Sequence, residues 1–177
     1  MTAQLLFIML SKSHGQEQVK LIGQIRYRYE ISKRDFNKDT NPTSYNLLQT
    51  RAGLFYVPAS DVAVFLQLQD SRILVEKEST LDGNAKRFDM HQAYLDIENL
   101  FHLPLALRLG RFESSFSNQR LIGAVGWNNA GRSFNGGFVA YHTTRGDITL
   151  FGYKINEQLN SGNEDDENFW GLWAALK

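Results

Sequence analysis

The sequence predicts an all-β protein, an antiparallel up-and-down meander of about eight strands. Three observations lead to this prediction. Apolar and polar residues alternate with a period of two in several segments, short and long connections take turns along the chain, and no segment shows convincing helical periodicity. A meander of this kind is either part of a larger β-barrel or a small barrel in its own right.

The stretch LIGQIRYRYEI at residues 21–31 shows the alternation most clearly. Every second residue is apolar, aromatic or glycine, and the polar residues between them are Gln24, Arg26, Arg28 and Glu30. Successive side chains of a β-strand point to opposite faces, so this strand presents one apolar face and one charged face. Residues 46–57, 62–70 and 88–98 repeat the pattern, and further candidate strands cover residues 104–111, 133–143, 147–155 and 168–176.

The connections between the predicted strands are of two kinds. Short connections lie around residues 57–61, 98–104 and 143–147, and long polar connections cover residues 33–45, 71–87, 112–132 and 156–167. Because the two kinds alternate strictly, we expect tight turns at one end of the sheet and long loops at the other. The loops near Asp35, Asn84, Asn118 and Asp165 then lie on one side, and the turns near Ser60, Asn99 and Gly146 lie on the opposite side.

Length and composition exclude several classes of protein. The 177 residues suit one domain. The 19 basic and 19 acidic side chains give a formal net charge of +0, and no basic run with interleaved aromatics occurs, so nucleic acid is not an expected partner. The absence of cysteine excludes a disulfide scaffold, and the absence of a run of about 18 apolar residues excludes a membrane-spanning helix.

We expect two regions along the chain, a leader at residues 1–18 and a β-barrel domain at residues 19–177. The leader has an apolar centre at residues 5–10, with no basic residue before it and no small-x-small cleavage site after it. It is either the rear of a signal peptide or an unstructured or weakly packed segment.

Alternation alone does not say which face of the barrel is outside. A soluble eight-stranded barrel that binds a small apolar ligand has its apolar face inside, whereas an outer-membrane barrel has lipid outside and water inside. The asymmetry between turns and loops and predicted strands of about 9 to 12 residues favour the membrane barrel. So do aromatic residues near the predicted strand ends, at Tyr27, Tyr29, Tyr56, Phe101, Trp170 and Trp173.

Several motifs in order give the sequence a family resemblance. They are VFLQLQDSR at residues 64–72, MHQAYLDIE at residues 90–98, LRLGR at residues 107–111 and QRLIGAVGWNNAGRSFNGG at residues 119–137. Over roughly residues 19–153 the chain resembles the alginate export family of bacterial outer-membrane barrels, and the ordered set of motifs is more specific than any one of them.

The chain also departs from the family pattern. Phe112 and Asn135 stand where the family usually has Gln and Asp, and the closing residues WAALK lack a terminal aromatic residue. Family members are much longer and have roughly twice the number of strands, so the resemblance implies an N-terminal portion of a barrel. An open sheet has unpaired strand edges, through which we expect the chain to self-associate.

The resemblance implies an outer-membrane pore that contacts outer-membrane lipid and passes anionic polysaccharide, such as alginate, or small anionic solutes. Arginine suits this cargo because it stays charged and forms two hydrogen bonds with a carboxylate. The candidate lumen residues on the predicted polar face, at the mouth and in the third long loop are Arg26, Arg28, Glu30, Arg51, Asp96, Arg108, Arg111, Arg120 and Arg132. The alternative is that these charges pair with one another across strands and hold the lumen rigid.

No other site is predicted, and we expect neither an enzyme nor a cofactor. The four histidines lack metal-ligand spacing, and alternation places His91 on the apolar face. The acidic run NEDDE at residues 163–167 lacks the ligand order of a calcium loop and is interpreted as a solvated loop tip. Glu30 and Asp96 are not interpreted as a glycosidase pair, and no Ser/His/Asp constellation is credible.

Overall fold

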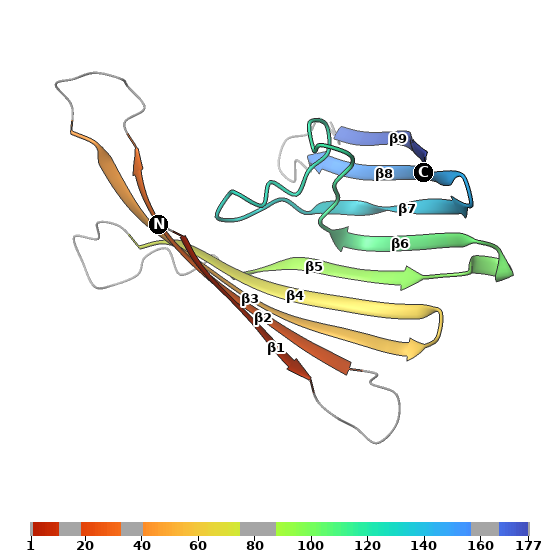
Figure 1. The fold of residues 1–177 in the computed structure, drawn as a ribbon, viewed down its shortest axis with the longest axis horizontal. Helices are drawn as coiled ribbons and strands as arrows, with labels where there is room; N and C mark the ends of the chain where they lie inside the picture. The colour runs from red at the N-terminus through yellow and green to blue at the C-terminus, as the bar shows by residue number, and fades with distance from the viewer. Residues whose placement is uncertain (1, 11–18, 33–40, 75–87, 157–166, 177) are drawn as a thin grey trace, which may run out of the picture.

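The computed structural model describes residues 2–10, 19–32, 41–74, 88–156 and 167–176. These residues form one antiparallel sheet of nine strands, in which each strand pairs with its neighbours in the sequence (Figure 1). The strands are β1 (Thr2–Leu10), β2 (Val19–Ser32), β3 (Thr43–Ala59), β4 (Val62–Ile73), β5 (Phe88–Ile97), β6 (Leu105–Phe112), β7 (Phe134–Thr143), β8 (Gly146–Asn156) and β9 (Glu167–Leu176). The all-β meander predicted from the sequence is confirmed.

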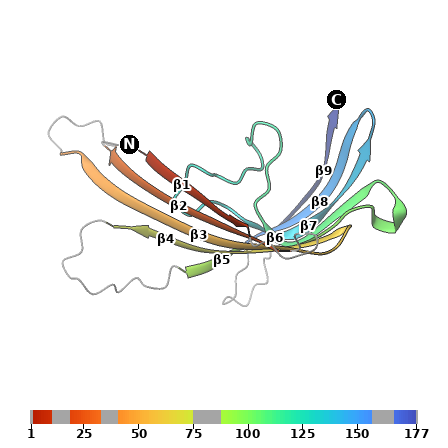
Figure 2. The ribbon, with the colours of Figure 1, turned by 60° about the horizontal axis from the view of Figure 1, so that its bottom comes forward.

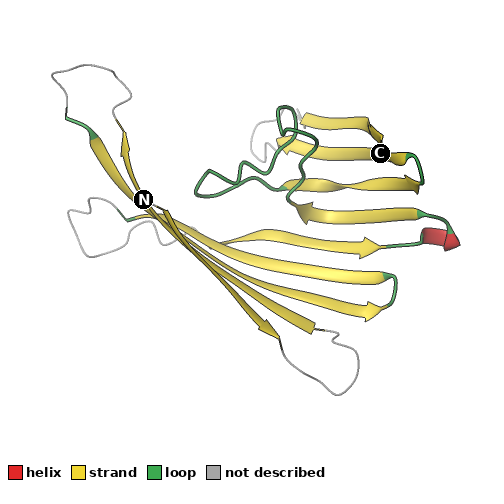
Figure 3. Ribbon diagram, viewed as in Figure 1, coloured by secondary structure: helices red, strands yellow, loops and turns green. Residues whose placement is uncertain are grey.

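The helical content of the described residues is one short 3-10 helix, η1 (Leu100–His102), in the turn between β5 and β6 (Figure 3). Within these residues no helix is long and apolar enough to cross a membrane.

β1 is a strand that the sequence pattern does not predict. It lies within residues 1–18, for which the sequence predicts a leader, and it pairs antiparallel with β2 from Thr2↔Arg28 to Leu10↔Lys20. Its sequence, TAQLLFIML, contains an apolar run without period-two alternation. Backbone pairing with β2 therefore defines this strand, and side-chain periodicity does not.

Two-residue turns join β3 to β4 and β7 to β8, as the sequence predicts for this end of the sheet. Gly146, which follows the second turn, has φ +155, and a Cβ atom there would lie 2.2 Å from the main-chain oxygen of Ala175. Only glycine fits this close approach of β8 to β9. At the other end, residues 113–133 connect β6 to β7 and include Asn118, whereas the predicted loops at Asp35, Asn84 and Asp165 lie outside the described residues.

The sheet is open and curved, with β1 and β9 at its two edges. In Figure 2 the two ends of the sheet rise on either side, and the connection between β6 and β7 lies within the concave side. We call this connection, residues 113–133, the inserted loop. It returns over strands as distant as β2, where Arg26 is bonded to residues 100 and 102 positions further along the chain.

The two faces of the sheet differ as the alternation predicts. Gln49 faces the inserted loop and is 1% exposed, whereas Ile25, on the opposite face, is 49% exposed. Large apolar side chains stay exposed on the convex face from β2 to β9, among them Tyr27, Leu54, Leu66, Leu109, Leu150 and Leu172. The molecule is therefore apolar on its convex side.

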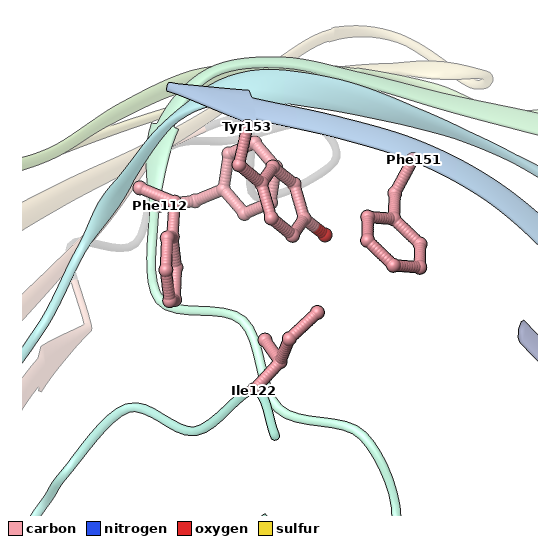
Figure 4. Close-up of a cluster of buried hydrophobic side chains, with 5 residues drawn as sticks. Phe112, Ile122, Phe151 and Tyr153 are labelled. Carbon is pink, nitrogen blue, oxygen red and sulfur yellow. The ribbon is translucent and has the colours of Figure 1, made fainter. Parts of the chain in front are cut away.

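The aromatic half of the concave face, on β6 to β9, packs against the first part of the inserted loop. Phe112, Phe134, Phe151 and Tyr153 form a buried cluster, and Ile122 of the loop points into it (Figure 4). The ring centroids of Phe134 and Phe151 each lie 5.1 Å from that of Tyr153. Nearby, Phe116 of the loop stacks on Trp173 of β9 at 5.6 Å and Ser114 shares a 2.9 Å hydrogen bond with the Tyr153 hydroxyl. Apolar contact thus fixes this part of the loop to the sheet.

Candidate functional site

The polar half of the concave face, on β2 to β4, holds the second part of the inserted loop. We call residues 126–130, with the sequence GWNNA, the strap. Each main-chain carbonyl of the strap accepts a hydrogen bond from a side chain of β2, β3 or β4. Because each unpaired carbonyl would carry a desolvation cost, this matching set of donors fixes the path of the strap.

Arg26 and Arg28 of β2 bind the first three strap carbonyls. Arg26 donates from Nη1 to Gly126 O and from Nη2 to Asn128 O, both at 2.5 Å. Arg28 donates from Nη1 to Trp127 O, and its Nε atom lies 2.8 Å from Glu30 Oε1. Two arginines of the predicted lumen set therefore hold the strap, and Glu30 of the same set pairs with one of them.

Neutral side chains bind the remainder of the strap. Gln49 donates to Asn129 O at 2.6 Å, Ser71 donates to the same oxygen at 2.8 Å, and Gln69 donates to Ala130 O at 2.7 Å. The Asn129 amide in turn donates to two main-chain oxygens, those of Leu48 and Arg72, at 3.3 and 3.0 Å. Alternation in residues 46–57 and 62–70 puts both glutamines on the polar face, but it indicates no role for them because the loop that they bind is remote in the sequence.

The ends of the inserted loop meet at His91. The Nε2 atom of His91 lies 2.7 Å from Oε1 of Glu113, the first loop residue, and its Nδ1 atom lies 3.3 Å from Oγ of Ser133, the last loop residue. Arg51 adds an ion pair to Glu113 at 3.0 Å and a hydrogen bond to Gln69 at 2.6 Å. His91 and Arg51 therefore link both ends of the loop to β3 and β5.

The Glu113 carboxyl is the titrating group at this junction. Its partial burial favours the neutral form, but the hydrogen bond from His91 and the nearby charge of Arg51 outweigh burial and hold the pKa of Glu113 below its ordinary value. The carboxylate is thus stabilised in its charged form at the base of the loop.

The predicted position of His91 on the apolar face is wrong. Gln67 pairs with Gln92, but the next pair is Leu68 with Met90, so His91 is an extra residue in a β-bulge of β5. The bulge changes the alternation, and the His91 side chain, 4% exposed, lies on the concave side with the loop. A single sequence without its strand partner contains no signal for this shift.

Arg108 and Asp96 form a separate pair, which lies against the aromatic side chains of β5 to β7. Arg108 donates from Nε and Nη2 to the two carboxylate oxygens of Asp96, at 2.6 and 2.7 Å. Its guanidinium carbon lies 4.1 Å from the centroid of the Tyr94 ring and 5.5 Å from those of Phe112 and Phe138. Cation–π contact and a bidentate ion pair therefore hold this arginine in place.

The other three predicted residues lie apart from the strap. Arg111 donates to Asn135 Oδ1 at 3.1 Å and lies 3.6 Å from Asp89. Arg120 and Arg132 are exposed and line two cavities between the inserted loop and β7 to β9, of about 500 and 420 Å³. Within the described part of the chain, no side-chain hydrogen bond or ion pair holds either of these two. The nine predicted residues thus divide among several places, and Arg26, Arg28 and Arg51 are the arginines gathered at the strap.

The strap cluster keeps a net positive charge. The guanidinium groups of Arg26, Arg28 and Arg51 meet the carboxylates of Glu30 and Glu113, and the main-chain carbonyls that they also bind are neutral. Nearby charges balance one another, since Arg72 pairs with Asp70 and Arg111 with Asp89. Chemically, this region can attract an anion that approaches over the concave face.

A comparison with known protein families identifies the architecture. The alginate export family model matches residues 17–169. The chain belongs to the alginate export family. The alginate export domain extends from the residues before β2 into β9 and contains the inserted loop and all nine predicted site residues. No curated protein matches the chain.

The alginate export domain offers no clustered metal ligands in its described residues. Over those ranges no group of three or more His, Asp or Glu side chains could hold a metal ion. The acidic run at residues 163–167 lies almost entirely outside them. Glu30 and Asp96 belong to different networks, one with Arg28 and the other with Arg108.

Proposed function

We propose that this alginate export protein is part of an outer-membrane pore that passes anionic polysaccharide, or small anionic solutes, along the concave side of its sheet. The observation that carries the proposal is the sorting of the two faces. Exposed apolar side chains cover the convex face, and the concave face is lined by arginine, glutamine and buried aromatic residues.

The convex face suits a lipid environment. Side chains such as Ile25, Leu66 and Leu150 are each about half exposed, and in water such a surface carries an unfavourable hydration free energy of about 25 cal/mol per Å². Acyl chains remove this cost, and the sheet satisfies its interior backbone groups between strands, as a membrane requires. A soluble barrel that binds an apolar ligand would need its apolar side chains on the concave side. Here the exposed apolar side chains cover the convex side, so the soluble barrel is disfavoured.

The concave face suits an anionic cargo. Arg26, Arg28 and Arg51 leave an excess of positive charge beside the strap, and Arg120 and Arg132 add exposed cations elsewhere on the inserted loop. Arginines engaged with neutral carbonyls bind a carboxylate weakly and reversibly, which conduction requires because a tight site traps the cargo. We expect no catalytic activity.

A change of charge in the strap cluster tests the proposal. With the chain inserted in planar bilayers under a salt gradient, the double variant Arg26→Gln, Arg28→Gln should have a reversal potential closer to zero than the unmodified protein. Salt screens each charge over about 8 to 10 Å, so two neighbouring substitutions should remove most of the local field.

The matched control is Arg145→Gln, which removes an exposed charge from the turn between β7 and β8 at the opposite end of the sheet. It should leave the anion preference unchanged. An anion preference that survives in the double variant would contradict the role of these arginines in selectivity.

A further inference from the structure

Trp127, at the second position of the strap, stands out because its side chain packs against so little. It is 74% exposed, and no described aromatic ring contacts it. Trp173 differs, since it is packed on Phe116. A large apolar ring that stays exposed to water contributes little hydrophobic stabilisation to the fold. Packing therefore does not explain a tryptophan at position 127.

The main chain around Trp127 is fixed without help from its indole ring. Arg26 binds the carbonyls on either side of it, at Gly126 and Asn128, and Arg28 binds the Trp127 carbonyl itself. A further bond from Asn128 N to Val125 O, at 2.9 Å, closes a turn around the residue. These hydrogen bonds hold the main chain of the strap in place, and the indole ring is free to contact a ligand.

Open space lies next to Trp127 along the strap. A Cβ atom added at Gly126 would meet nothing within 4 Å. The strap residues that follow Trp127 line a cavity of about 370 Å³, whose lining does not include Trp127 itself. The cavity is lined by Gln69, Ser71, Ile73, Asp89, Asn128, Asn129 and Ala130. A ligand that contacts the indole thus has open space at Gly126, and the next strap residues offer polar groups. The Asp89 carboxylate in the cavity lining lies 3.6 Å from Arg111.

We propose that Trp127 is a stacking platform for a sugar ring, with Arg26 and Arg28 placed beside it for the carboxylate of that sugar. The face of an indole ring is electron-rich, and the C–H groups on one face of a pyranose carry partial positive charge, so the two surfaces attract each other. A guanidinium next to this platform recognises a carboxylate. A uronate unit combines these two features, whereas an inorganic anion offers only charge.

This inference rests on the proposed function and adds to it a residue that contacts the sugar rings of the cargo. It also explains why the strap is held so firmly by arginines, since the same side chains position the ring and supply the charge. A platform of this kind acts at each sugar that passes, because stacking does not depend on the hydroxyl pattern of an individual unit.

The experiment is a calorimetric titration of the folded chain in detergent micelles with three probes. They are a hexameric oligouronate, a neutral oligosaccharide of equal length and inorganic phosphate. Trp127→Ala should weaken oligouronate binding by about 3- to 10-fold, the range expected for loss of one aromatic contact, and should leave phosphate binding unchanged. Trp127→Phe keeps a ring and should retain most of the affinity.

Trp170→Ala is the matched control. Trp170 is as exposed as Trp127, at 77%, but it lies on β9 beside Leu172 of the convex face. Its removal should leave oligouronate affinity unchanged. Equal affinities in Trp127→Ala and the unmodified chain, or an equal loss in Trp170→Ala, would overturn the platform.

The neutral oligosaccharide separates this inference from the proposed function. Weak binding of the neutral probe that Trp127→Ala reduces supports the platform, even where the arginine variants fail to alter anion selectivity in bilayers. Loss of selectivity in the arginine variants together with unaltered sugar binding in Trp127→Ala would instead leave the anion pore standing and remove the platform.

Discussion

At the scale of single residues, the two ends of the inserted loop are attached to the sheet at one junction, formed by His91, Arg51 and Glu113. His91 contacts the first and last loop residues, and Arg51 connects the same carboxylate to β3. These contacts fix the loop where the sheet supplies rigid neighbours. The charge state of Glu113 should therefore control how firmly the loop is attached.

We predict that acid weakens this attachment through Glu113. Its pKa is lowered in the folded protein from an ordinary value of 4.5, so its contribution to stability is complete above that value and is lost as the pH falls through the folded pKa. Proteolysis within residues 117–121 should accelerate below about pH 4.5 in the unmodified chain, measured with an acid-active protease. In Glu113→Gln this acceleration should be absent.

Glu98→Gln is the control for this measurement, because Glu98 is an exposed carboxyl after β5, near the turn end of the sheet. It should leave the acid dependence as it is. If proteolysis of Glu113→Gln still accelerates in acid as much as that of the unmodified chain, another group titrates at the junction.

We also predict that His91→Ala loosens the loop at neutral pH. The substitution removes the His91 contacts to Glu113, which keeps its ion pair with Arg51, and to Ser133, at a cost of about 1 to 3 kcal/mol. The midpoint of urea unfolding in micelles measures this cost. His142→Ala, which alters an exposed histidine at the β7–β8 turn, should change the midpoint much less.

At the scale of elements, each strand separates two environments by alternation. On β2, Ile25 faces outward and is half exposed, whereas its neighbour Gln24 lies on the face of Arg26. The bulge in β5 shows that alternation holds only between irregularities, since one extra residue moves His91 to the concave side.

The face assignment predicts opposite results for the same substitution at adjacent positions. Ile25→Arg places a cation on the convex face near the middle of β2 and should cost about 2 to 4 kcal/mol when lipid covers that face. Gln24→Arg places the cation on the concave side and should be tolerated. Membrane assembly, followed by heat-modifiable migration in gels, measures both variants. Equal assembly of the two would mean that lipid does not cover the convex face.

At the scale of the whole molecule, the curved sheet and the inserted loop act together. Curvature brings β2 and the strap close enough for Arg26 to reach carbonyls 100 residues away in the sequence, and the aromatic cluster anchors the other part of the loop (Figure 2). The loop therefore occupies part of the space over the concave face. Any passage along this face is narrowed by the strap.

Removal of the strap should widen this passage. We predict that a variant with residues 126–130 replaced by two glycines has a larger single-channel conductance in planar bilayers. Its anion preference should persist, because Arg26 and Arg28 lose their carbonyl partners and gain free donors. Replacement of residues 117–120 in the same way should have a smaller effect, since these residues lie outside the strap. Unchanged conductance on removal of the strap would contradict its role as the constriction.

The sequence by itself determined the all-β meander, seven connections of alternating length and the polar and apolar sides of most strands. These features are local, because the pleat of a strand sends residues such as Ile25 and Arg26 to opposite faces whatever the strand pairs with. The family motifs were equally readable, since they lie in continuous stretches such as residues 119–137.

Only the tertiary structure decided what the polar side chains bind. The carbonyls that Arg26 and Arg28 bind belong to a loop about 100 residues further along the chain. The bulge that places His91 on the concave side depends on the register of β5 with β4. β1 is a strand because β2 pairs with it. Such contacts depend on sheet curvature and on strand register. Both arise when distant segments pair, and neither leaves a periodic signal in the chain.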